Sequence, residues 1–167
     1  MKHIPFLANK LDFHYYRRDA ETQKSYEQLY DLLIPNRLII KTMDYYKTSG
    51  IILDACITVH KIMGPCLLES IYEECLMKEF ELRMVKAKNQ VPISLIYKTF
   101  KLSKELKIDI LVENEIILEL KSTEIMHPVY EAQIISYLKL ANKRLGFLIN
   151  FSAPVLKDGF KRYVNNF

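Results

Sequence analysis

The 167-residue chain lacks an apolar run long enough to cross a bilayer. Its first part, residues 1–18, also lacks the apolar core of a signal peptide, because charged and aromatic residues are scattered through it. Internal repeats and low-complexity tracts are absent as well. These absences predict a cytoplasmic protein with no membrane partner, built as one domain with a short appendage.

Cysteine is scarce, and its three copies form no CxxC pair. Structural zinc sites usually use close cysteine or histidine pairs, so Cys56, Cys66 and Cys75 do not favour a metal–thiolate site. Free and mostly buried thiols in a reducing compartment are expected instead.

Charge of one sign is also in small excess, with a formal net charge of +4. Such an excess permits nucleic-acid binding without requiring it, because it is common on ordinary protein surfaces. Half of the residues are hydrophobic and 26% are charged, which is the balance of a globular protein with a substantial core.

The apolar spacing predicts a helix at 21–33 that Pro35 ends, and a helix at 49–63 that Ser49 caps and Gly64-Pro65 breaks. We therefore expect an N-terminal helical extension over residues 1–46 and an α/β domain over residues 47–167. In that domain, the pattern predicts a helix at 67–82, strands at 91–97, 106–112 and 116–121, a helix at 128–141 and a strand at 145–151.

Residues 106–121, LKIDILVENEIILELK, contain two apolar runs around a polar turn and predict an antiparallel hairpin. Asp109 lies five residues before Asn114, and Glu119 lies five residues after it. In that register the two carboxylates face each other, with β-carbons roughly 5 Å apart. A slip of one residue would remove the match. Lys121, two residues beyond Glu119, shares its face of the strand.

Two like charges side by side cost energy, and Mg²⁺ or Mn²⁺ would compensate them. The adjacent Lys121 could hold or deprotonate a water or stabilise a phosphate, which suits phosphodiester hydrolysis. Alternation favours a second interpretation, in which the even positions form the core and the face of Asp109 and Glu119 is solvated. Leu111 and Ile117 on that face argue against it, and the spacing leaves both interpretations open.

Two further groups of residues are candidates for contacts with a substrate. Tyr130, Gln133 and Tyr137 form a stripe on the predicted helix at 128–141 that could reach a phosphate, a base or a metal-bound water. By itself, such a stripe is more often a wet helix face. A set of evenly spaced lysines allows either a basic rim for a phosphate backbone or the solvated edge of a hairpin. They are Lys98, Lys101, Lys104 and Lys107.

The order of these elements resembles the PD-(D/E)XK nuclease superfamily in its RecB-like branch. The elements are Glu69, Asp109, Glu119-Leu120-Lys121 and Gln133-x-x-x-Tyr137. The stretches at 59–73, 108–124 and 128–162 resemble more closely the small bacterial GxxExxY family. The resemblance covers residues 49–164 and leaves residues 1–46 outside.

The resemblance implies a restriction-endonuclease-like core, in which helices flank a mixed central β-sheet. It also implies a Mg²⁺-dependent nuclease, with Mn²⁺ as a possible substitute; DNA is the expected substrate, and the residues leave RNA open. Asp109, Glu119 and the backbone carbonyl of Leu120 would be the metal ligands. A homodimer is compatible with this interpretation. The alternative is a catalytically silent nucleic-acid-binding or protein-interaction module that retains the fold.

The resemblance also assigns roles to four side chains around the metal. Lys121 would be the catalytic lysine, and Glu69 would be a helical carboxylate that supports the metal or its water. Gln133 and Tyr137 would form the pair that orients the site.

Three positions depart from the family pattern without removing a proposed ligand. Cys66 replaces the first glycine of the GxxExxY motif, which removes backbone freedom and adds bulk. Ile108 precedes Asp109 where the superfamily's name has proline. Tyr130 stands where histidine is expected, so a polar contact near the metal would differ.

Overall fold

The computed structural model describes residues 43–165. The helix predicted at 21–33 lies outside these residues, and the extent of the N-terminal extension remains a prediction. The chain divides after Met43, and the account below concerns the unit that begins at Asp44. None of the helices in the described part is both long enough and apolar enough to cross a membrane.

Two helices precede the sheet, α2 (Tyr45–Met63) and α3 (Glu69–Leu82). The prediction that Ser49 caps the first helix was wrong, because Asp44 accepts a hydrogen bond from the Lys47 amide at 2.9 Å and starts the helix one turn earlier. Ser49 lies inside α2 and donates to the Tyr45 carbonyl. Gly64, at φ +77°, ends α2 where the Gly-Pro pair predicted a break.

The five strands form one mixed sheet in the order β1-β2-β3-β4-β5. Their bounds are β1 Ala87–Tyr97, β2 Phe100–Val112, β3 Ile116–Lys121, β4 Leu145–Asn150 and β5 Phe160–Val164. Only β3 and β4 pair in parallel, since α4 (Pro128–Leu140) carries the chain across between them. A short 3-10 helix, η2 (Leu156–Gly159), precedes β5. The predicted α/β fold with a mixed central sheet and flanking helices is confirmed, and β5 is an added strand.

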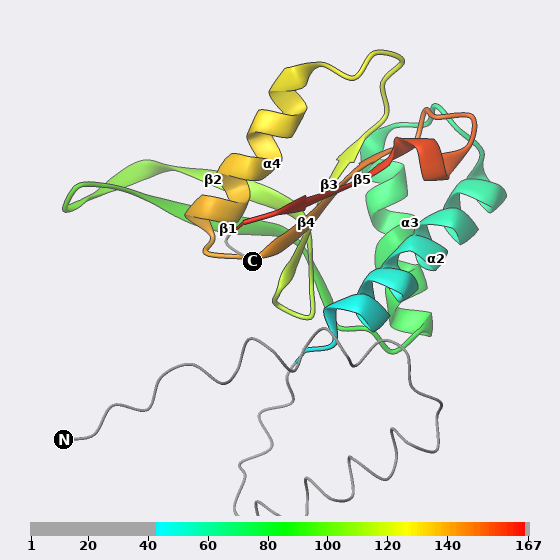
Figure 1. Ribbon diagram of the computed structural model, residues 1–167, viewed down its shortest axis with the longest axis horizontal. Helices are drawn as coiled ribbons and strands as arrows, with labels where there is room; N and C mark the ends of the chain where they lie inside the picture. The colour runs from blue at the N-terminus through cyan, green and yellow to red at the C-terminus, as the bar shows by residue number, and fades with distance from the viewer. Residues whose placement is uncertain (1–42, 166–167) are drawn as a thin grey trace, which may run out of the picture. The chain divides into compact units, whose positions relative to one another are not determined.

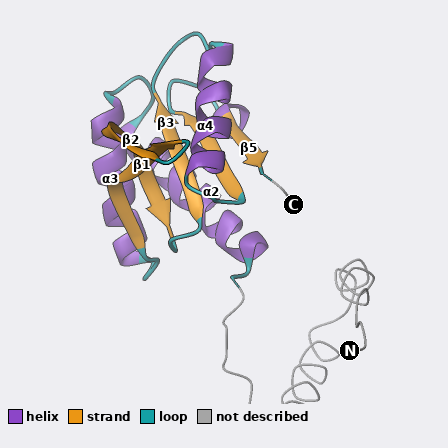
Figure 2. Cartoon of the chain, turned by 90° about the vertical axis from the view of Figure 1, so that its left-hand side faces the viewer, coloured by secondary structure: helices purple, strands orange, loops and turns teal. Residues whose placement is uncertain are grey.

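Helices cover both sides of the sheet, with α4 on one side and α2 and α3 on the other (Figures 1 and 2). Ile134 and Leu138 of α4 belong to one buried apolar cluster with Ile117 of β3 and Leu148 of β4. Tyr72 of α3 stacks on Phe151, with ring centroids 4.1 Å apart. Because both sides are covered, β3 is buried along almost its whole length.

The interpretation that left the face of Glu119 in solvent is therefore wrong. Glu119 is 1% exposed, and Leu111 and Ile117 on the same side of the hairpin are buried as well. Burial of a carboxylate without full pairing costs free energy, so its place in the core requires a compensating partner.

The three cysteines are free thiols in different settings. Cys56 is buried, and this burial raises the pKa of its thiol, so it is an unreactive core residue. Cys75 is half-buried, whereas Cys66 is exposed. The expectation of a buried thiol was therefore wrong for Cys66. Cys66 lies in the left-handed region at φ +64°, a conformation that glycine adopts without strain.

Replacing Cys66 with glycine is expected to raise the free energy of unfolding by about 0.5–1 kcal/mol. The removal of left-handed strain outweighs the greater entropy of the unfolded glycine chain. Urea denaturation measures the change. Cys75→Gly, in the interior of α3, is the matched control and should lower stability by about 1 kcal/mol. An equal decrease in the free energy of unfolding in Cys66→Gly and Cys75→Gly would contradict this explanation.

Candidate functional site

The hairpin of β2 and β3 opens where the acidic residues lie. The last direct pair is Ile110 with Leu118, and the same register places Asp109 opposite Glu119, as predicted. The Leu120 amide donates to Asp109 Oδ2 at 2.8 Å, so the carboxylate takes the position of a further strand hydrogen bond. This hydrogen bond fixes the orientation of the Asp109 carboxylate at the edge of the opening.

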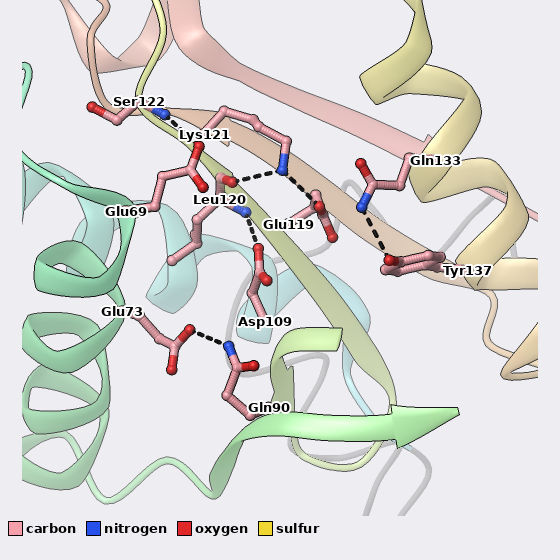
Figure 3. A network of polar contacts seen from close by, with 10 residues as sticks. All are labelled: Glu69, Glu73, Gln90, Asp109, Glu119, Leu120, Lys121, Ser122, Gln133 and Tyr137. Carbon is pink, nitrogen blue, oxygen red and sulfur yellow. Dashed lines mark hydrogen bonds and ion pairs between the residues drawn. The ribbon is translucent and has the colours of Figure 1, made fainter. Parts of the chain in front are cut away.

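Glu119 and Lys121 point together from the end of β3 (Figure 3). Lys121 Nζ donates to Glu119 Oε1 at 2.8 Å and to the Leu120 carbonyl at 3.1 Å. The ammonium therefore bridges two of the three predicted metal ligands. Glu119 Oε2 is buried and has no hydrogen-bond partner in the described part of the chain.

Burial and neighbouring charge shift the proton equilibria of these groups. Burial, and then the negative charge of Asp109, raise the pKa of Glu119 to about 7. Burial is also the largest cause of the raised pKa of Asp109. Burial acts to lower the pKa of Lys121, but its hydrogen bond to Glu119 and the surrounding carboxylates raise it above its ordinary value. Lys121 is therefore an ammonium at neutral pH.

Helix α3 brings two carboxylates to the same opening (Figure 3). Glu69, at its first turn, accepts a hydrogen bond from the Ser122 amide at 3.1 Å. Glu73, one turn later, accepts from Asn89 at 2.8 Å and from Gln90 at 2.6 Å. The charges of Glu73 and Glu69 both contribute to the raised pKa of Asp109.

Glu73 and its partners Asn89 and Gln90 were not predicted from the sequence. The available signal was the i, i+4 spacing of Glu69 and Glu73, which places both carboxylates on one helix face. Gln90 has φ +51°, an uncommon conformation for a residue that is not glycine, and no local pattern predicts it.

Helix α4 supplies the third group of predicted residues. Gln133 Nε2 donates to Tyr137 Oη at 3.0 Å, and Figure 3 shows this pair on the α4 side of Glu119. Tyr137 is only 8% exposed, so the interpretation of the stripe as a wet helix face is wrong for this residue. The centroid of the Tyr130 ring lies 5.3 Å from Lys121 Nζ, within the range of a cation–π interaction. Tyr130 stands where the family pattern has histidine, so this contact replaces the one that a histidine would make.

A family model described as the PD-(D/E)XK nuclease superfamily matches residues 46–163. The chain belongs to the PD-(D/E)XK nuclease superfamily. No curated protein matches it. Membership indicates a phosphodiesterase that acts on nucleic acid, and nucleases of this superfamily generally use divalent metal ions. Assignment to the GxxExxY family and to the branch with the QxxxY motif remains a prediction.

The donor set in this PD-(D/E)XK chain fits a hard divalent cation. Residues 43–165 contain no group of three or more histidine, cysteine, aspartate or glutamate side chains that could hold a metal. Asp109, Glu119 and the Leu120 carbonyl offer oxygen only, and Glu119 Oε2 is the buried atom that needs a partner. Mg²⁺ suits such a site because it usually keeps several water molecules and takes one or two protein carboxylates.

Polar contacts around the end of β4 hold the segment that follows β3. Asn150 is buried, and its side chain bonds both the amide and the carbonyl of Thr123, at 3.1 and 2.8 Å. His60 Nε2 lies 3.0 Å from the Ala153 carbonyl, so this histidine has a structural contact away from the carboxylates. This role of Asn150 was not predicted, because its partners are backbone atoms and a pattern of side chains in the sequence does not reveal such contacts.

An open cleft of about 570 Å³ lies next to Glu69, between the start of α3 and the segments after β3 and β4. Its lining includes Cys66, Ser122 and Ser152. The Ser122 and Ser152 hydroxyls lie 3.2 Å apart and share a hydrogen bond. The cleft gives the carboxylate of Glu69 access to solvent beside the candidate site.

Proposed function

We propose that this PD-(D/E)XK protein is a Mg²⁺-dependent nuclease that hydrolyses phosphodiester bonds in DNA, with Mn²⁺ able to replace Mg²⁺. The observation that carries the proposal is the buried Glu119 Oε2, which has no partner among the described residues and lies beside the half-buried carboxylate of Asp109 and the ammonium of Lys121. An apolar core would not retain this arrangement for stability alone, since the unsatisfied atom costs free energy.

Asp109, Glu119 and the Leu120 carbonyl are the proposed ligands of the ion. Asp109 is already oriented by its hydrogen bond with the Leu120 amide. When bound, Mg²⁺ polarises a phosphoryl oxygen and lowers the pKa of a bound water. The two carboxylates would neutralise the charge of the ion, and the ion would in turn offset the repulsion between them.

Lys121 is the proposed catalytic lysine. Since its raised pKa keeps it protonated, it donates hydrogen bonds to a phosphate oxygen or to the attacking water and does not remove a proton itself. The Tyr130 ring on one side of the ammonium limits the directions in which Nζ can move.

Three further side chains are proposed to orient the substrate and the water around this centre. Gln133 and Tyr137 act as a hydrogen-bonded pair that contacts the scissile group. Glu69, which is exposed and held by the Ser122 amide, supports the water shell of the ion.

Cleavage is tested with supercoiled plasmid, linear duplex and single-stranded DNA, and with RNA, in Mg²⁺, Mn²⁺ or EDTA. The expected result is DNA cleavage that requires the ion and exceeds RNA cleavage. In parallel, millimolar Mg²⁺ should raise the Tm of the protein, since binding to the native state adds stability. Glu81→Gln, at an exposed position of α3, is the control and should change neither result.

Tight DNA binding without cleavage and without a metal-induced rise in Tm would contradict the nuclease proposal. That combination would favour a catalytically silent binding module. A Tm rise with RNA as the better substrate would retain the metal site and contradict the choice of DNA.

A further inference from the structure

The hairpin of β1 and β2 extends well beyond the rest of the sheet. We call residues 94–107 the arm. In it, β1 pairs only with β2, at Ser94 with Glu105, Ile96 with Lys101 and Tyr97 with Phe100, whereas β3 pairs with β2 only over residues 110–112. Figure 1 shows the arm projecting at the left of the view, and Figure 2 shows it nearly end-on. All residues from 96 to 105 are exposed.

The arm combines positive charge with exposed apolar groups. It carries four lysines against one glutamate, a formal net charge of +3, compared with +4 for the whole chain. Tyr97 and Phe100, which face each other at its end, are 61% and 68% exposed. Lys98 Nζ lies 5.6 Å from the Tyr97 ring. Neither the charge nor the aromatic pair contributes to the core, so both are available to a partner.

The arm is continuous with the candidate site. Lys107, at its base, lies two residues before Asp109 in β2, so the two side chains leave the strand on the same side. A phosphodiester chain placed at Asp109 therefore passes the base of the arm. The register shift leaves two extra residues in β2, so β1 sets the length of the arm: Pro92 pairs with Lys107, and six residues from Pro92 to Lys98 at about 3.3 Å each give roughly 20 Å. That length is about six base-pair steps of B-DNA at 3.4 Å each.

We propose that the arm is a DNA-binding element that lies in the major groove of the duplex that the site cleaves. The choice of partner rests on the proposed nuclease function. The major groove of B-DNA admits a two-stranded β-ribbon, whereas the major groove of A-form RNA is too deep and narrow for one. Lys98, Lys101 and Lys104 contact phosphates, and Tyr97 and Phe100 contact apolar base edges such as thymine methyl groups.

The test uses the full chain and a fluorescein-labelled 20-base-pair duplex of mixed sequence, with EDTA present to prevent cleavage. Fluorescence anisotropy measures Kd between 50 and 200 mM salt. The variant Lys98→Ala/Lys101→Ala/Lys104→Ala should bind at least about tenfold more weakly, and the slope of log Kd against log salt should fall by about 2.5. Tyr97→Ser/Phe100→Ser should weaken binding at least about threefold.

The matched control removes the same charge from exposed lysines of the helices. It is Lys47→Ala/Lys78→Ala/Lys139→Ala. This variant should bind DNA within about twofold of the wild type. If the arm-lysine variant binds as well as this control, the arm does not contact DNA. The arm-lysine variant is also tested with duplex RNA of the same sequence. If it loses as much affinity for this RNA as for DNA, the placement in the major groove is overturned.

A small phosphodiester separates failure of the arm proposal from failure of the nuclease proposal. Bis(para-nitrophenyl) phosphate reaches the site without reaching the arm, so the arm-lysine variant should hydrolyse it in Mn²⁺ at the wild-type rate. If the wild type does not hydrolyse it or DNA, the nuclease proposal fails, whatever the arm binds.

The exposed rings of Tyr97 and Phe100 could instead contact a second copy of the chain. Sedimentation velocity tests it. A wild-type dimer that Tyr97→Ser/Phe100→Ser converts to a monomer, with unchanged affinity for DNA, would overturn the proposal in favour of self-association.

Discussion

Replacing Lys121 with methionine is expected to lower the rate of metal-dependent DNA cleavage by about 10²–10³-fold. The variant keeps an unbranched stem over the Tyr130 ring but loses the ammonium that would donate to the phosphate or the attacking water. Single-turnover cleavage of a labelled duplex measures the effect on the chemical step.

The fold of this variant should survive, because Glu119 can take up a proton once its cationic partner is removed. The Tm at pH 6 should therefore change little, and Mg²⁺ should still raise it. Lys161→Met is the matched control: Lys161 pairs with Glu131 on the surface at 2.9 Å, away from the carboxylate pair, and its removal should leave the rate within about twofold. Wild-type rates in Lys121→Met would exclude this lysine from catalysis.

The second large effect concerns stability and pH in the absence of metal. The pKa of Glu119 is about 7 in the folded chain and near its ordinary 4.5 in the unfolded chain. Between these values the folded state binds more protons, so the protein in EDTA should lose stability as pH rises from about 4.5 through about 7. The pKa difference corresponds to roughly 3 kcal/mol. The raised pKa of Asp109 acts in the same direction.

Urea unfolding at a series of pH values, in EDTA and in Mg²⁺, measures this dependence. Glu119→Gln should flatten the decline, because the neutral amide does not titrate. Mg²⁺ should flatten it in the wild type as well, since the ion binds the ionised carboxylates and competes with the proton. A decline of equal size in the wild type and in Glu119→Gln would show that another group causes it.

The hairpin could be predicted because its information is local. The polar residues 113–115 between two apolar runs set the turn, and the turn set the register that places Asp109 opposite Glu119. Gly64-Pro65 likewise ended α2 by backbone restriction alone. Both features depend on residues that are near one another in the sequence.

The features that could not be predicted depend on distant partners. The apolar residues at the even positions of β2 and β3 suggested that the odd face was solvated, but α4 covers that face from elsewhere in the chain, so Glu119 is buried. Strand β5 is short and partly exposed, and its pairing with β4 rather than its own pattern defines it. The contacts of Glu73 with Gln90 join a helix to a strand with an unusual backbone angle, which no periodicity reveals.

The most direct test of the proposed metal site is anomalous diffraction from crystals soaked in Mn²⁺. The predicted result is one anomalous peak within ligand distance, about 2.0–2.3 Å, of Asp109, Glu119 Oε2 and the Leu120 carbonyl, with Lys121 Nζ displaced from that carbonyl. Full Mn²⁺ occupancy elsewhere, or no peak at these three atoms at millimolar Mn²⁺, would contradict it.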